Sequence, residues 1–164
     1  MADPATFNAI LTAFPVIVGG ALAIAGGLAS QFAIHRLAER REVAKLRRER
    51  IESLVKAVYA QSRWISDRSN KMVFRNEDHD EPWPLDDARM IQDLYFPELK
   101  AEVHAVGIAC LPMTKFIGEQ RVKHMRDRDT FIKEYDPTVF DEAYEKYLLA
   151  VSALTERCRA LLSE

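Results

Sequence analysis

The apolar positions of this chain are concentrated in one uninterrupted block near its N-terminus. Residues 5–34 contain no Asp, Glu, Lys, Arg or His, and residues 14–34 are almost entirely apolar. A helix of about 20 apolar residues is long enough to cross the hydrocarbon core of a bilayer. A soluble helix of this length would need a polar face, and a cleaved secretory signal would need a basic start, which the first four residues lack. The pattern therefore predicts a transmembrane anchor over residues 1–35.

A helical period continues beyond the apolar block, with no Gly or Pro between Leu28 and Trp64. The apolar residues that share one helical face are spaced by seven: Leu37, Ala44, Ile51 and Val58. The other seam position near the membrane holds arginine, so a tight coiled coil is not expected there. The spacing predicts a long helix that leaves the membrane and joins a bundle at its far end.

Two later stretches carry sustained helical stripes, in which apolar residues recur at alternating spacings of three and four. The stripe residues are Leu99, Val103, Val106, Cys110, Met113 and Ile117 in the first stretch, and Phe140, Tyr144, Tyr147, Val151, Leu154, Cys158 and Leu161 in the second. Pro97 can begin the first helix, and Asp136 with Pro137 supplies an N-cap and first position for the second. A short helix is expected over Leu85–Phe96.

Polar segments separate these helices, and loops are expected over Ser66–Pro84 and Arg121–Asp136. No stretch has the alternation of a strand. The predicted fold is therefore all-α, with an N-terminal transmembrane helix that continues into a cytosolic antiparallel helical bundle. The expected organisation is an anchor at residues 1–35, a basic juxtamembrane helix at 36–50 and the bundle at 51–164.

Charge is strongly partitioned, although the formal net charge is only −2. Residues 36–50 carry seven cationic side chains against three carboxylates, a net charge of +4, whereas residues 75–102 carry three against nine, a net charge of −6. The N-terminal flank of the apolar block has no Lys or Arg. Because basic residues stay on the cytoplasmic side, the N-terminus is expected outside and the bundle in the cytoplasm.

The basic helix at residues 36–50 has three candidate roles. It can simply fix the membrane topology, it can bind anionic lipid headgroups, or it can bind nucleic acid. Near a bilayer each cation contributes about 1 kcal/mol of attraction to anionic lipid, and salt weakens this attraction. The candidate lipid-binding side chains are Arg36, Arg40, Arg41, Lys45, Arg47 and Arg48.

Small residues recur at every fourth position inside the apolar block, at Gly19, Ala23 and Gly27. This spacing lets the backbones of membrane helices approach closely, which drives their association. The chain is therefore expected to form a homo-oligomer through this face. The alternative is that Gly and Ala are simply common in membrane helices.

Residues with the chemistry of catalysis or metal binding are few. The run Glu77–Glu81 combines one His with four carboxylates, but it has no second element at metal-ligand spacing and is interpreted as a solvated acidic loop. Cys110 and Cys158 lie on apolar stripes, where buried reduced thiols are expected. No nucleophile motif or glycine-rich phosphate loop occurs, so no metal or other cofactor is expected.

The segment Arg75-Asn76-Glu77-Asp78-His79 is similar to a motif of the HEPN superfamily, a group of small helical domains that includes many RNases. In that motif an Arg and a polar residue precede a His, so that Arg stabilises phosphate charge and His moves a proton. The resemblance implies a membrane-tethered RNase with Arg75 and His79 as catalytic candidates. Here the gap is one residue shorter, and the segment lies in a predicted loop.

The layout of the whole chain resembles a broad group of bacterial single-pass inner-membrane proteins with a cytosolic helical domain. The residues that carry the likeness are the Gly/Ala-rich span, the Arg/Glu-rich helix Leu37–Arg50 and Leu94–Leu99. The layout is also similar to membrane pore accessories of RNA-guided antiviral systems, which implies a pore or membrane effector in phage defence.

Three functions from different classes follow from these patterns. The sequence favours a non-enzymatic, self-associating protein of the bacterial inner membrane. The alternatives are the HEPN-like RNase and a membrane adaptor that recruits a cytosolic protein partner through its bundle.

Overall fold

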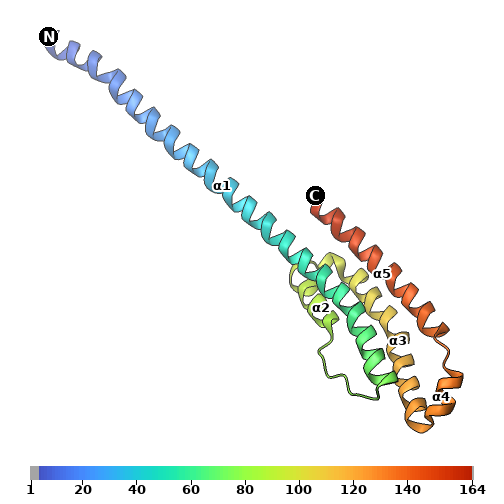
Figure 1. Ribbon diagram of the computed structural model, residues 1–164. Coiled ribbons are helices and arrows are strands. Elements are labelled where there is room, and N and C mark those ends of the chain that lie inside the picture. The colour runs from blue at the N-terminus through green and yellow to red at the C-terminus, as the bar shows by residue number, and fades with distance from the viewer. Residues whose placement is uncertain (1–3, 164) are drawn as a thin grey trace. The chain divides into compact units, whose positions relative to one another are not determined.

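The computed structural model describes the backbone of residues 4–163 and the side chains of residues 27, 30–32 and 34–163. In this part of the chain every regular element is helical and no strand occurs, which confirms the all-α prediction (Figure 1). The chain divides into two compact units, Met1–Leu46 and Arg47–Glu164. Among the residues that were described, no helix has the length and apolar character to cross a membrane. Most side chains of the predicted span at 14–34 lie outside the described ones, although its backbone is helical.

Helix α1, Pro4–Ser69, is continuous, as the absence of Gly and Pro between Leu28 and Trp64 predicts. In the first unit the described side chains are exposed, and they include large apolar ones at Phe32, Ile34 and Leu37.

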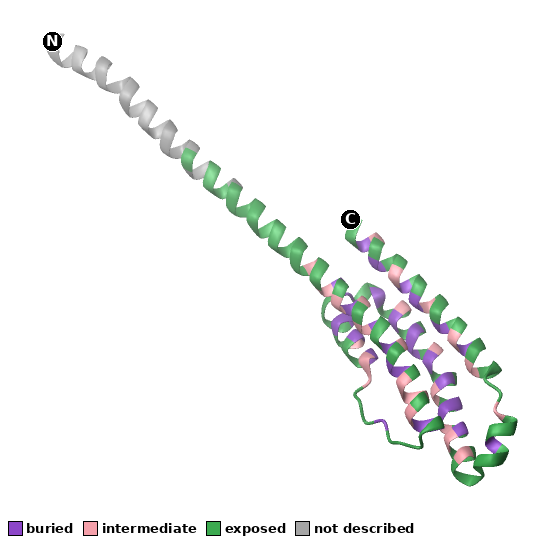
Figure 2. Ribbon diagram, in the orientation of Figure 1, coloured by how far each residue is buried: buried purple, intermediate pink, exposed green. Residues whose placement is uncertain are grey.

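The second unit is a helical bundle in which α1 and α3 run in one direction and α2 and α5 return (Figure 1). Its helices are the end of α1, α2 (Pro84–Tyr95), α3 (Lys100–Arg126), α4 (Arg128–Glu134) and α5 (Thr138–Ser163). A 3₁₀ turn, Pro97–Leu99, joins α2 to α3. Helices α3 and α5 lie side by side with their apolar stripes facing inward (Figure 2).

The core of the bundle consists of the residues that the helical periodicity predicts. All six residues of the first stripe are buried, Leu99 in the 3₁₀ turn and the other five in α3. The stripe residues of α5 are buried from Tyr147 onward, whereas Phe140 and Tyr144 are half-buried. Tyr147 also donates its hydroxyl hydrogen to the Val58 carbonyl at 2.8 Å, which joins α5 to α1 inside the core. Burial raises the pKa of the Tyr147 hydroxyl above its ordinary value, so it stays protonated as the donor.

The predicted loop over Ser66–Pro84 is partly wrong. Helix α1 continues to Ser69 and ends in a π-helical turn, Asn70–Phe74. The helical structure extends this far because Met72 and Val73, although they lie in a polar stretch, are buried in the core. The helix ends where Asn76 adopts a left-handed backbone conformation with φ of 56°, which asparagine tolerates better than most residues. Of the predicted loop, only residues 75–83 are irregular.

The predicted loop over Arg121–Asp136 is also wrong for most of its length. Helix α3 continues to Arg126, and α4 follows after the single residue Asp127. Asp127 caps α4, because its carboxylate accepts hydrogen bonds from the Thr130 backbone N–H at 3.1 Å and from the Thr130 hydroxyl at 2.7 Å. Phe131 is buried against the core, which gives this short helix an apolar anchor within a charged segment.

We expect the cap of α5 to make its stability pH-dependent. The Asp136 carboxylate accepts hydrogen bonds from the hydroxyl of Thr138 at 2.5 Å and from its backbone N–H at 2.9 Å, and these bonds hold the pKa of Asp136 below its ordinary value. The contribution is complete above the unfolded pKa and is lost as pH falls through the lower folded pKa. Asp136→Asn should keep the cap but reduce this acid sensitivity, and Asp136→Ala should destabilise α5 at neutral pH. Thermal unfolding between neutral pH and about pH 2 tests this.

Candidate functional site

The histidine of the acidic segment is buried where this segment packs against α1. The His79 side chain is 0% exposed, and its ring is perpendicular to that of Trp64 of α1, with the ring centroids 5.0 Å apart. Trp83 stacks on Trp64 at 6.2 Å, and the Arg68 guanidinium lies over the Trp64 ring at 5.0 Å. The interpretation of Glu77–Glu81 as a solvated loop is therefore wrong for His79, although the four carboxylate residues around it are exposed.

Backbone and side-chain hydrogen bonds hold this segment against α1. The Trp64 indole N–H donates to the Glu81 carbonyl at 3.0 Å, and Arg68 donates to the His79 carbonyl at 3.5 Å. Lys71 bonds the Glu81 carboxylate at 2.8 Å, which raises the pKa of Lys71 and lowers that of Glu81. These contacts hold the His79 imidazole against the Trp64 ring.

Both ring nitrogens of His79 lack a hydrogen-bond partner among the described residues. The Nε2 atom lies 3.9 Å from a carboxylate oxygen of Glu81, beyond hydrogen-bond distance. A general acid or base must reach the proton that it moves. The buried imidazole has no such access to a phosphodiester in this structure.

Arg75, the other candidate of the HEPN-like motif, is exposed. Its backbone N–H donates to the Asn70 carbonyl at 3.3 Å, and no hydrogen bond or ion pair of the described part of the chain joins its side chain to His79. The geometry therefore gives the RNase hypothesis no assembled pair of catalytic groups.

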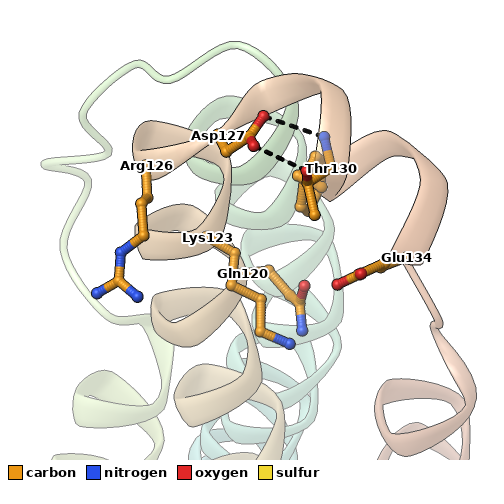
Figure 3. A pocket seen from close by; sticks show the side chains of 7 residues that line it. Gln120, Lys123, Arg126, Asp127, Thr130 and Glu134 are labelled. Carbon is orange, nitrogen blue, oxygen red and sulfur yellow. Dashed lines mark hydrogen bonds between the residues drawn. The ribbon is translucent and has the colours of Figure 1, made fainter.

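A small cavity of about 140 Å³ lies where α3 meets α4 (Figure 3). Its lining residues are Gln120, Lys123, Arg126, Asp127, Thr130, Phe131 and Glu134. In Figure 3 the side chains of Gln120 and Lys123 extend toward Glu134, whereas Arg126 extends away from it. The Asp127 carboxylate accepts the Thr130 backbone N–H and the Thr130 hydroxyl, so its hydrogen-bonding capacity serves the cap of α4.

The two thiols are free, and they are buried as the sequence predicts. Burial raises the pKa of Cys110 to about 12 and that of Cys158 to about 11, so both are protonated at neutral pH and are poor nucleophiles. Among the described side chains no group of three His, Cys, Asp or Glu residues is arranged to hold a metal ion.

The predicted lipid-binding side chains lie along α1. Arg36, Arg40, Arg41 and Lys45 belong to the first unit, and all four are exposed. In the second unit Arg48 is exposed, and Arg47 is half-buried with its guanidinium 4.0 Å from the Glu98 carboxylate. Four of these side chains have no ion-pair partner among the described residues, so their charges are available to an external anion. They are Arg36, Arg40, Arg41 and Arg48.

The predicted oligomerisation residues fall mostly outside the described side chains. This applies to Gly19 and Ala23, whereas Gly27 is described and exposed. A methyl group placed on Gly27 would meet no atom within 4 Å, so the surface at this position is open within one copy of the chain.

Sequence reasoning missed the residues that surround His79. Trp83 lies between Pro82 and Pro84, a rigid and apolar interruption of an acidic stretch that is a signal for a buried anchor. The pairing of Arg121 with Asp78 at 2.7 Å, and of the His124 ring with the Val73 carbonyl at 2.5 Å, has no local sequence signal. Comparison of the chain with protein-family models, with the sequences of known proteins and with solved structures finds no match.

Proposed function

We propose that this chain is a membrane-anchored scaffold that associates with copies of itself through its N-terminal span and holds its helical bundle on the cytoplasmic side. The observation that carries the proposal is the uncharged block at residues 5–34, followed directly by the net charge of +4 at residues 36–50. Both belong to α1, which continues through them without interruption. A span followed by a basic segment is the pattern of a helix that enters the membrane from the cytoplasmic side.

Exposed side chains of α1 support this proposal. Phe32, Ile34 and Leu37 are apolar and exposed in a single copy, and Gly27 has open space around it. A lipid bilayer or a neighbouring span would cover such a surface. The unpaired arginines at 36, 40, 41 and 48 suit anionic headgroups, whose attraction would fix the height of the helix at the interface.

The bundle favours a scaffold over an enzyme. His79 is buried, Arg75 is not joined to it, and both thiols are protonated at neutral pH. What the bundle offers instead is surface, because it exposes large apolar side chains on α2, α3 and α5. Exposed apolar side chains of this kind serve contacts with other proteins.

Two matched substitutions test the association of the spans. Ala23→Leu adds three carbon atoms on the Gly19–Gly27 face, and Ala25→Leu makes the same change about 200° around the helix. We expect the chain to resist alkaline extraction from membranes in both variants, since Leu keeps the span apolar. In detergent, Ala23→Leu should weaken self-association about tenfold or more, and Ala25→Leu should leave it near the wild-type value.

Light scattering of the detergent-extracted chain measures the mass of the assembly. A strictly monomeric wild-type chain would contradict the proposed self-association. Complete release by alkaline extraction would contradict the membrane anchor. Equal effects of the two leucine variants would contradict the assignment of the contact to the Gly19–Gly27 face.

A further inference from the structure

A cleft of about 670 Å³ lies between α1 and α2, and its two walls carry opposite charges. The α1 wall presents Arg50 and Lys56, and the α2 wall presents Asp86 and Asp87. Asp86 pairs with Arg89 at 3.4 Å, whereas the other three have no ion-pair partner among the described residues. The apolar residues of the lining are Ala57, Ala60, Trp83, Met90 and Ile91. The cleft therefore suits an apolar side chain that has a carboxylate on the α1 side and a cation on the α2 side.

The outer face of α5 carries the matching arrangement, which we call the α5 ridge. Its centre is Leu149, which is 71% exposed and lies opposite the buried stripe. At about 100° per residue, Glu145 and Glu156 lie within about 40° of Leu149 on one side, and Lys146 and Arg157 lie about 60–80° from it on the other. All four are exposed and have no ion-pair partner in the described part of the chain.

Hydrogen bonds between α5 and α1 fix the level of the ridge along the bundle. Tyr147 bonds the Val58 carbonyl at 2.8 Å, and about one turn away the Tyr144 and Ser62 hydroxyls are 2.8 Å apart. The two helices are antiparallel, so at about 1.5 Å per residue Leu149 is level with the middle of residues 50–60, which form the α1 wall of the cleft. Two bundles that lie side by side in the same direction therefore bring the ridge of one to the cleft of the other.

The charged residues match in level as well. By the same count Glu156 is level with Arg50. The Arg50 guanidinium lies over the Tyr95 ring of α2 at 4.9 Å, which sets the level of α2 and makes Asp87 level with Lys146. This register pairs Glu156 with Arg50 at one end of the contact and Lys146 with Asp87 at the other.

The order of charges from left to right also matches. Viewed from outside with its C-terminus upward, α5 has the ridge glutamates to the left of Leu149 and the ridge cations to the right, because a right-handed helix advances to the right as it rises. In this orientation α1 descends (Figure 1), and Ala57, which lines the cleft, lies to the left of Val55, which lines a groove with α5. The left wall of the cleft is therefore α2 and the right wall is α1. Facing surfaces exchange left and right, so the glutamates meet the cationic wall and the cations meet the acidic wall.

We propose that the α5 ridge of one copy docks into the α1–α2 cleft of a second copy of this chain. The inference rests on the proposed self-association and names its cytoplasmic contact, since copies with one membrane topology present their bundles in the same direction. Leu149 enters the cleft beside Met90, which is 55% exposed in a single copy. Complementary charge around an apolar centre gives such a contact its orientation and its selectivity.

The ridge and the cleft are separate surfaces of one bundle. Among the described residues α2 and α5 make no contact with each other. The α5 residues that face α1 are Thr155, Cys158, Arg159 and Leu162, and none of them belongs to the ridge. Each copy can therefore use both surfaces at once, in a head-to-tail contact that forms a ring when its rotation closes.

Cysteine pairs on two differently tagged populations of the full chain test the contact. One population carries Leu149→Cys on the ridge and the other carries Met90→Cys in the cleft. After mild oxidation in the membrane we expect a disulfide between the populations and none within either one, because the contact joins unlike surfaces. The native thiols are buried and do not compete. In the control, Leu148→Cys, which is also exposed but lies about 100° around α5, should not cross-link to Met90→Cys.

Charge reversal supplies the second measurement. Lys146→Glu and Asp87→Lys should each weaken the assembly about tenfold in light scattering, and both changes in one chain should restore it, because the reversed charges meet across the contact. Asp93→Lys makes the same change about 240° around α2 from Asp87 and should leave the assembly at its wild-type mass. The contact joins bundles that are already folded, so its loss changes the assembly and not the packing inside one bundle.

The outcomes separate the docking from the association of the spans. A disulfide within either population, equal cross-linking of the Leu148→Cys control, or no restoration by the double charge reversal would overturn the docking while the wild-type chain stays associated. A monomeric wild-type chain would overturn both.

Discussion

Replacing Leu154 with alanine is expected to lower the free energy of unfolding of the bundle by about 2–5 kcal/mol. Leu154 lies at the centre of the α5 stripe and is 1% exposed, among the buried side chains of α1 and α3. The substitution removes apolar contacts and leaves a cavity that closely packed neighbours fill only in part. A loss of this size is a large fraction of the stability of a domain of ordinary size.

The same helix provides a matched control. Leu149 lies on the solvent-exposed face of α5 and is 71% exposed, so Leu149→Ala removes the same atoms without opening a cavity. Its effect on the free energy of unfolding should stay within about 0.5 kcal/mol. Urea unfolding, followed by the fluorescence of Trp64 and Trp83 within the bundle, measures both. Similar losses for the two variants would mean that α5 is not packed by the stripe that its sequence predicts.

The apolar periodicity of the chain predicts the positions of α3 and α5, because every buried stripe residue contributes to the pattern independently of what it packs against. The start of α5 is predictable for the same local reason, because Asp136 accepts the Thr138 backbone N–H as an N-cap does. Helix α2 begins at Pro84, one residue before the predicted Leu85, and Pro97, the predicted start of the next helix, begins a 3₁₀ turn that precedes α3. These signals act within one turn of helix.

The parts that could not be predicted depend on contacts between distant residues. Met72 and Val73 continue α1 into a polar stretch because the core accepts them, and the neighbouring sequence gives no indication of it. His79 is buried because Trp64, fifteen positions earlier, provides a surface for its ring. The pairing of Arg121 with Asp78 likewise has no local cause. The charge pattern alone therefore predicts that the whole Glu77–Glu81 run is exposed, which is wrong for His79.

The burial of His79 depends on Trp64, so we expect Trp64→Ala to lower the free energy of unfolding and to expose His79. Trp64→Ala removes the ring that contacts His79, Trp83 and Arg68, together with the indole donor to the Glu81 carbonyl. Loss of a buried tryptophan costs about 3–5 kcal/mol. We expect that loss in urea unfolding, and we expect the segment at residues 75–83 to separate from α1, since the indole both covers and bonds it.

Chemical modification reports this separation directly. Diethylpyrocarbonate modifies accessible imidazoles, so His79 should be protected in the wild-type chain and modified in Trp64→Ala, whereas exposed His104 should react equally in both. Trp64→Phe keeps an aromatic ring but not the N–H, so it should lose about 1 kcal/mol and leave His79 protected. If His79 stays protected in Trp64→Ala, the hydrogen bonds of Arg68 and Lys71 are sufficient to hold the segment. If it reacts in Trp64→Phe, the indole hydrogen bond is the main restraint, because it is the interaction that the phenylalanine ring lacks.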